Sequence, residues 1–218
     1  MMSDVLRSER RGRSAHHRLR CACAPFCMSS VDERGCMREL SLHVLDALEN
    51  SLEAGATVIE LTIREDTGAD RLSITLGDNG RGMNAVQLDR IFNPFFTTRR
   101  TRHVGLGIPL FKAAAERCNG NLTITSQLGE GTTLRAHFQY SHIDRAPLGD
   151  TTGMLLAIIL AGSCDLHYVH RIDGERFEFD TRELRAELGA IPLTHPEVRR
   201  WLQEFIAQAE DKLRRKSQ

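Results

Sequence analysis

Asp78-Asn79-Gly80-Arg81-Gly82-Met83 is the stretch that decides the fold, because it places a carboxylate directly ahead of two flexible glycines. Glycine allows backbone conformations and close approaches that other residues resist. Taken alone, the stretch also fits a type I turn, where Asp and Gly are favoured. Two segments in order with it, Glu49-Asn50-Ser51 upstream and Gly105-Leu106-Gly107 downstream, indicate a nucleotide site instead.

The segment upstream of this loop predicts a two-faced helix from Arg38 to the break at Ala54-Gly55-Ala56, with Gly55 as a natural terminating residue. Apolar residues recur at helical spacing along one arc, and polar residues line the opposite stripe. The apolar residues are Leu40, Val44, Ala47, Leu48 and Leu52, and the polar ones are His43, Asp46, Asn50 and Glu53.

Strand and helix patterns alternate along the next part of the chain. Asn84 is expected to cap a short helix, and residues 108–117 predict another. The order helix, strand, strand, helix, lid, helix, strand, strand predicts an α+β fold, a two-layer sandwich with helices on one face of a mixed, mostly antiparallel sheet. The alternating segments that predict its strands are 57–64, 71–76, 122–126 and 132–140.

The three motifs together resemble the GHKL ATPase superfamily, which includes DNA gyrase, Hsp90-type chaperones, mismatch-repair ATPases and sensor histidine kinases. The resemblance covers residues 37–140 and implies the Bergerat ATP-binding fold. A narrower similarity, through residues 141–150, is to stand-alone ATP-binding proteins encoded beside iron-only hydrogenase or NADH-dehydrogenase-like subunits. It implies a protein partner related to a hydrogenase or another redox complex.

The resemblance assigns the adenine side of the site. Asp78 would accept a hydrogen bond from the adenine amine, Gly80 and Gly82 would let the backbone pass close to the base, and Met83 would pack on it. Leaving such an acceptor unpaired costs about 1–3 kcal/mol, which is enough to select adenine over guanine. Thr132 would support Asp78 through a water; a hairpin turn residue is the alternative.

The phosphate side carries Asn50 and Asp46. Asn50 would ligate a Mg²⁺ that bridges the phosphates, since a neutral amide oxygen suits this ion. A solvated helix face is the alternative. Asp46, one turn earlier, would orient the attacking water, although hydrolytic relatives usually carry Glu there and Asp is one methylene shorter. His43 is expected to cap or pack.

A glycine hinge and a basic lid complete the predicted phosphate site. Gly105, Leu106 and Gly107 open a helix whose backbone N–H groups would face phosphate. Arg99 lies in the lid and could pair with a phosphate, or belong to a solvated basic loop.

Composition limits the classes of partner and location that are expected. The 29 Lys and Arg residues balance 29 Asp and Glu residues, which gives no positive field for nucleic acid. The longest apolar run, 154–161, falls short of the roughly 20 residues that span a bilayer and predicts a buried helix. Residues 1–36 are Arg-rich without a signal-peptide core and predict a disordered leader, or else a transit peptide. A cytoplasmic protein without a membrane partner is expected.

The remaining chain predicts a connector over residues 141–150 and a small α/β appendage over residues 151–218. The appendage would hold an apolar helix over 151–161, two short strands, and two further helices. The last helix is expected to dock through Trp201, Phe205 and Ile206.

These features predict a Mg-ATP-binding protein that hydrolyses ATP or phosphorylates a partner in a regulatory role, and therefore an ATPase or protein kinase of the histidine-kinase-like type. The alternative is a non-catalytic, ATP-responsive module that switches a partner complex through its lid and appendage. A full sensor kinase is not expected, because no sensor region, membrane span or phosphoacceptor hairpin precedes Arg38.

Overall fold

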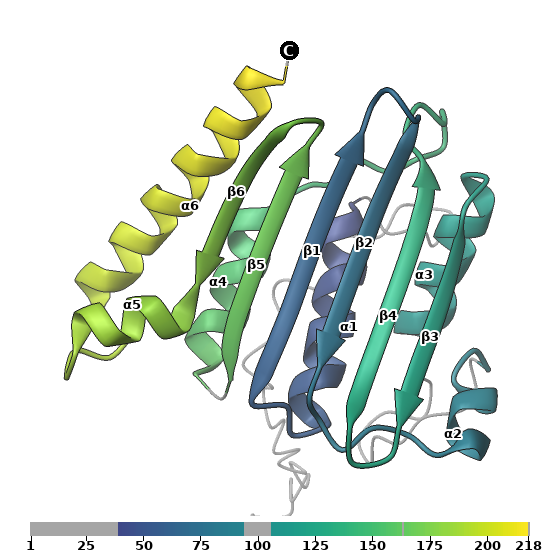
Figure 1. Ribbon diagram of the computed structural model, residues 1–218, viewed down its shortest axis with the longest axis horizontal. Coiled ribbons are helices and arrows are strands. Elements are labelled where there is room, and N and C mark those ends of the chain that lie inside the picture. The colour runs from purple at the N-terminus through teal and green to yellow at the C-terminus, as the bar shows by residue number, and fades with distance from the viewer. Residues whose placement is uncertain (1–38, 94–105, 163, 218) are drawn as a thin grey trace, which may run out of the picture.

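The computed structural model describes residues 39–93, 106–162 and 164–217, and these form one six-stranded sheet covered by helices (Figure 1). The strand order is β3-β4-β2-β1-β5-β6. Its strands are β1 (Val58–Asp66), β2 (Arg71–Asp78), β3 (Asn121–Gln127), β4 (Gly131–Gln139), β5 (Asp165–Ile172) and β6 (Glu175–Asp180). The helices are α1 (Leu40–Glu53), α2 (Ala85–Arg90), α3 (Gly107–Arg117), α4 (Thr151–Ala161), α5 (Thr181–Leu188) and α6 (Pro196–Lys216).

The sheet is mixed and mostly antiparallel, as the sequence predicts. Neighbouring strands pair antiparallel, except that β5 runs parallel to β1. α1, α3 and α4 lie behind the sheet in Figure 1, which confirms the α+β fold with helices on one face. The alternation of side chains along β1 explains why the helices pack on one face. Ile59, Leu61 and Ile63 are fully buried, while the alternating Glu60 and Arg64 are exposed.

Local capping sets several element ends. The Asn84 side chain and the Gln87 side chain form a reciprocal capping box at the start of α2, as expected for Asn84. The Asp150 side chain accepts from the backbone of Gly153 at the start of α4, and Gly162 ends that helix with φ +70°. α4 therefore covers the apolar segment predicted to be a buried helix.

The C-terminal region extends the same sheet. Val58 pairs with Asp165 at the start of the parallel β1–β5 ladder, and β6 then pairs with β5. The alternating pattern predicts these two strands but not their place beside β1. The division into an ATP-binding domain, a connector and an appendage stays a prediction, while the sheet runs without interruption through both parts of the chain.

The last helix docks differently from expectation. Ile206 is fully buried, as predicted, and Phe205, although 38% exposed, packs its ring on Phe177 and Phe179 of β6 at 6.0 and 6.3 Å between centroids. Trp201 is 47% exposed, so its prediction as a docking residue was wrong. The rings of Trp201 and Phe205 stack on each other at 5.1 Å between centroids. The buried stripe of α6 instead follows residues Val198, Leu202, Ile206, Glu210 and Leu213.

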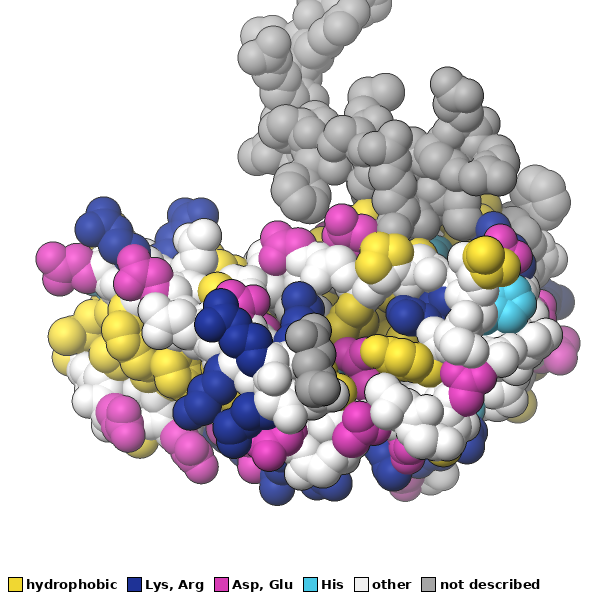
Figure 2. Space-filling view, turned by 90° about the horizontal axis from the view of Figure 1, so that it is seen from above, with side chains coloured by type: hydrophobic (Ala, Val, Ile, Leu, Met, Phe, Trp, Pro, Cys, Tyr) yellow, Lys and Arg dark blue, Asp and Glu magenta, His cyan; other side chains and the backbone are white. Residues whose placement is uncertain are grey.

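The surface of one face and the length and polarity of the helices bear on what the protein could contact. Seen from above in Figure 2, apolar side chains gather on one flank among scattered charges of both signs. Within the described ranges, every helix is too short or too polar to cross a membrane.

Candidate functional site

Asp78, the last residue of β2, is held by two donors. The hydroxyl of Ser51 donates to Oδ2 at 2.7 Å, and the backbone N–H of Gly80 donates to Oδ1 at 2.9 Å. Ser51 is buried on α1, one residue after Asn50. A carboxylate oxygen can accept more than one hydrogen bond, so both oxygens keep capacity for a ligand donor. The carboxylate is thereby fixed where the end of α1 meets the end of β2.

The two glycines after Asp78 permit this junction. A Cβ on residue 80 would lie 2.8 Å from the Cβ of Ala54 at the end of α1. Gly82 has φ +64°, and a Cβ there would lie 2.0 Å from the carbonyl oxygen of Gln127. The Arg81 backbone also donates to the carbonyl of Ala54 at 3.0 Å. The loop therefore passes between α1 and the β3–β4 turn with no room for side chains at either glycine.

Asn79 is a structural residue that sequence reasoning did not single out. Its Oδ1 accepts from the backbone N–H groups of Thr57 and Val58, each at 2.9 Å. Its amide also donates to the Thr57 hydroxyl at 2.8 Å. Asn in a turn commonly bonds backbone in this way, and that tendency was the available signal. Asn79 ties the site loop to the start of β1.

Ser126 on β3 joins two predicted site residues. Its hydroxyl accepts from the Met83 backbone N–H at 2.9 Å and donates to the Gly131 carbonyl at 2.7 Å. The Thr132 hydroxyl lies 3.0 Å from Ser126 Oγ, and Thr132 pairs with Asp78 across the β2–β4 ladder. No motif in the sequence marked Ser126.

Asp46 meets the start of α3. A Cβ on residue 107 would lie 3.3 Å from both the Cβ and the Oδ2 of Asp46, so the missing side chain of Gly107 makes room for this carboxylate. Gly107 begins α3, and Leu106 before it is 47% exposed. Asn50 lies one turn beyond Asp46 on α1 and is exposed. The carboxylate therefore faces a helix N-terminus, where anions are favoured.

His43 is a buried packing residue. It is 3% exposed and stacks on Phe111 with 5.2 Å between ring centroids and 6° between planes. The expectation of a packing role is confirmed, but its place on the polar stripe was wrong, because α3 covers this part of α1. Burial, with the nearby Arg117 charge, lowers the pKa of His43 to about 4. Among the described residues, none provides a hydrogen bond to His43 Nδ1.

The structure thus brings most of the predicted residues to one end of the sheet. Arg99 and Gly105 lie outside the described residues. Those placed around the end of β2, the end of α1 and the start of α3 are Asp46, Asn50, Asp78, Gly80, Gly82, Met83, Leu106, Gly107 and Thr132.

The donor set fits a nucleotide-held magnesium ion. Among the described residues, His, Cys, Asp and Glu side chains form no cluster that could hold a metal by itself. Mg²⁺ commonly takes only one or two protein ligands and completes its shell with waters and phosphate oxygens. An exposed amide on α1, next to the residue that holds Asp78, meets that requirement.

Comparison with known proteins decides the family of this region. Residues 37–142 match the family described as histidine kinase-, DNA gyrase B- and HSP90-like ATPase. Residues 37–142 are a GHKL ATPase domain. The GHKL match spans β1 to β4 and the helices that carry the candidate site, so this part of the chain is an ATP-binding, histidine-kinase-like ATPase domain.

Two relatives agree with the GHKL assignment. A putative sensor protein of Shewanella frigidimarina is 31% identical over 121 residues, which cover 55% of this chain and 18% of the relative. The sensor histidine kinase ZraS of Escherichia coli is 38% identical over 76 residues, which cover 35% of this chain and 16% of the kinase. The chain therefore spans less than a fifth of each relative. The fold also superposes on a crystal structure of the N-terminal domain of a DNA repair protein with a TM-score of 0.47 and 16% sequence identity. The superposition covers 64% of this chain and 51% of the repair-protein chain.

Proposed function

We propose that this protein binds Mg-ATP at the end of α1 and β2, and hydrolyses it or passes its γ-phosphate to a partner protein in a regulatory role. The supporting observation is that one helix provides both halves of the site. Ser51 on α1 holds the Asp78 carboxylate, while Asp46 on the same helix faces the start of α3.

The adenine end would work through Asp78. Its fixed carboxylate accepts from the exocyclic amine of adenine, whereas guanine presents a carbonyl there and would leave two acceptors facing each other. Such a mismatch costs on the order of 1–3 kcal/mol. Gly80 and Gly82 keep side chains out of the loop that the base would approach.

The phosphate end would work through Asp46, Asn50 and Gly107. Asn50 would hold Mg²⁺, which supplies charge neutralisation for the phosphates. Gly107 offers backbone N–H at the start of α3. Asp46 would orient water and accept its proton as the water oxygen bonds to the γ-phosphorus and the bond to the bridging oxygen of ADP breaks. Phosphorylation of a partner would use a side chain of that partner in place of water.

A non-catalytic switch is the second candidate function. Asp46 is one methylene shorter than the Glu of the hydrolytic relatives that the sequence resembles, so it reaches less far towards an attacking water. The partner in either case is a protein, and the resemblance of residues 141–150 supports one from a hydrogenase or another redox complex. Action in the cytoplasm is part of the same proposal.

Titration calorimetry and a turnover assay test these functions together. With Mg²⁺ present, Asp78→Asn should weaken ATP binding at least tenfold, about what loss of one charged hydrogen bond produces. Asp46→Asn should keep ATP affinity and lower release of labelled phosphate about 100-fold, the lower range of a general-base contribution. Asp144→Asn, on an exposed connector residue, is the matched control.

The outcomes separate the candidates. ATP binding without turnover or a labelled partner would favour the switch over the enzyme. A wild-type protein that ignores ATP, or an Asp78→Asn variant with unchanged affinity, would contradict both.

A further inference from the structure

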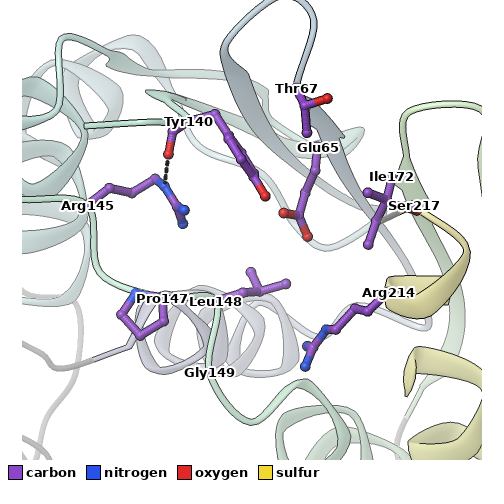
Figure 3. Close-up of a pocket in the computed structure, with 10 residues that line it drawn as sticks. All are labelled: Glu65, Thr67, Tyr140, Arg145, Pro147, Leu148, Gly149, Ile172, Arg214 and Ser217. Atoms are coloured by element: carbon purple, nitrogen blue, oxygen red, sulfur yellow. Dashed lines mark hydrogen bonds between the residues drawn. The ribbon is translucent and has the colours of Figure 1, made fainter. Parts of the chain in front are cut away.

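A pocket lies away from the candidate ATP site. Its volume is about 330 Å³, at the small end of the range for small-molecule sites. Its walls come from β1, the residue after β4, the connector, the end of β5 and the end of α6. The lining residues on which the argument depends are Glu65, Tyr140, Arg145, Leu148, Ile172 and Arg214 (Figure 3).

The pocket and the ATP site lie at opposite ends of α1. The carbonyls of Pro147 and Leu148, which line the pocket, accept from the backbone N–H groups of Leu40 and Ser41 at 2.9 and 2.8 Å, in the first turn of α1. Ser51, which holds Asp78, belongs to the last turn of that helix. The pocket therefore belongs to a separate site.

Arg145 is fixed in place with donors to spare. Its Nε donates to the Tyr140 carbonyl at 2.6 Å and its Nη1 to the Ala146 carbonyl at 3.2 Å. The guanidinium also lies 4.8 Å from the centroid of the Tyr140 ring. Arg has five N–H donors in a rigid fork, so these contacts orient Arg145 and leave other donors for a ligand.

Arg214 reaches the same pocket from α6. Figure 3 shows its guanidinium entering from the side opposite Arg145, with the Leu148 side chain between them. Arg214 lies 3.9 Å from the buried carboxylate of Glu210, and its side chain is 45% exposed. Lys and Arg side chains are also visible beside acidic and apolar ones at this end of the molecule in Figure 2. Two cations from different segments thus converge on one cavity.

Glu65 places one negative charge between these cations. Its Oε1 lies 3.0 Å from Nε2 of the buried His170, and its side chain is 13% exposed. Burial alone would raise the pKa of Glu65, but the hydrogen bond to His170 and the charges of His170, Arg145 and Arg214 outweigh it and lower the pKa. Glu65 is therefore ionised at neutral pH and can accept from a ligand.

We propose that this pocket binds a small organic carboxylate that also carries a hydroxyl or ammonium group. The guanidiniums of Arg145 and Arg214 would take the carboxylate, which matches their planar forks. The hydroxyl or ammonium would donate to Glu65, and a short carbon chain would contact Leu148 and Ile172. A phosphate is disfavoured, because its second negative charge would lie in the same small cavity as Glu65.

Titration calorimetry with two matched probe pairs tests this site. L-lactate and propionate differ by one hydroxyl, and L-valine and isovalerate by one ammonium, and each of the four carries a single carboxylate. The member of each pair that carries the donor should bind about tenfold tighter or more, since it alone can donate a further hydrogen bond to the Glu65 carboxylate. Glu65→Gln should remove that preference within each pair.

Neighbouring arginines on α6 supply the control. Arg214→Gln should weaken L-lactate or L-valine binding about tenfold, whereas Arg215→Gln, which removes the same charge one exposed residue later, should not. ATP titration of each variant verifies folding and should give unchanged affinity. The proposal fails if all four probes give no heat up to about 10 mM, if both members of each pair bind equally, if inorganic phosphate binds more tightly than they do, or if Arg215→Gln weakens binding as much as Arg214→Gln.

Discussion

The hydroxyl of Ser51 on α1 donates to Asp78 Oδ2 at 2.7 Å, so a helix side chain fixes the carboxylate that ends β2. The backbone N–H of Gly80 fixes the other oxygen. Preorganised acceptors bind better than mobile ones, because the cost of ordering them is already met by the fold.

Ser51→Ala is therefore expected to lower ATP affinity by about three- to tenfold, the range for loss of one positioning hydrogen bond. Titration calorimetry measures it. Ser41→Ala is the matched control, because Ser41 is also buried on α1 but in its first turn. Equal effects of the two substitutions would show that Ser51 acts on the stability of α1 and not on Asp78.

Gly82→Ala is expected to lower the free energy of unfolding by more than about 3 kcal/mol, because the new Cβ would clash with backbone and residue 82 has positive φ. That Cβ would lie 2.0 Å from the Gln127 carbonyl oxygen. Gly129 also has positive φ, +84°, but has open space around it. Gly129→Ala should cost only about 1–2 kcal/mol, from backbone strain alone. Urea unfolding of both variants checks the difference, and similar costs would contradict the clash.

Stability should fall as the pH rises past neutrality because of His170. Burial alone lowers the pKa of His170, but hydrogen bonds to Glu210 and Glu65 outweigh it and raise the pKa from 6.5 to about 8. The stabilisation is complete below about 6.5 and is lost as the pH rises through about 8, a change of about 2 kcal/mol. Urea unfolding between about pH 6 and about pH 9 measures it. His170→Gln should flatten this dependence, and an unchanged slope would refute the assignment.

His43 should give a dependence of opposite sign at lower pH. Its folded pKa of about 4 lies below the unfolded value of 6.5, so the unfolded chain binds the proton first as the pH falls. The free energy of unfolding should therefore decrease from about 6.5 down to about 4, by about 3 kcal/mol. His43→Phe keeps the stack on Phe111 and should remove this decrease while leaving the alkaline one. Acid unfolding followed by circular dichroism separates the two, and an unaltered acid limb in the variant would exclude His43 as its source.

Local sequence patterns predicted the elements well. Thr151–Ala161 is helical over the predicted range because Asp150 caps its start and Gly162 ends it. The Asn84 cap and the alternating strands are also decided by neighbours along the chain. The pairing of β5 with β1 was not predictable in the same way, because alternation marks a strand without naming its partner.

The sequence predicted the loop residues of the candidate site better than the residues that hold those loops in place. Asp78, Gly80 and Gly82 carry a recognisable order, whereas the roles of Ser51 and Ser126 arise only when distant segments meet. His43 looked polar on a helical wheel, yet Phe111 from another helix buries it. Trp201 likewise looked like a docking residue, but it lies one position before Leu202 of the buried stripe of α6 and is half exposed.

The parallel pairing of β1 with β5, which starts with Val58 opposite Asp165, has a consequence for biosynthesis. On the ribosome, β1 emerges long before its β5 neighbour has been translated, so the growing polypeptide carries an open sheet edge until β5 follows. Such edges recruit strands from other molecules and drive aggregation. A truncated chain that ends after β4 would keep the whole nucleotide loop, but the edge of β1 would stay unpaired permanently.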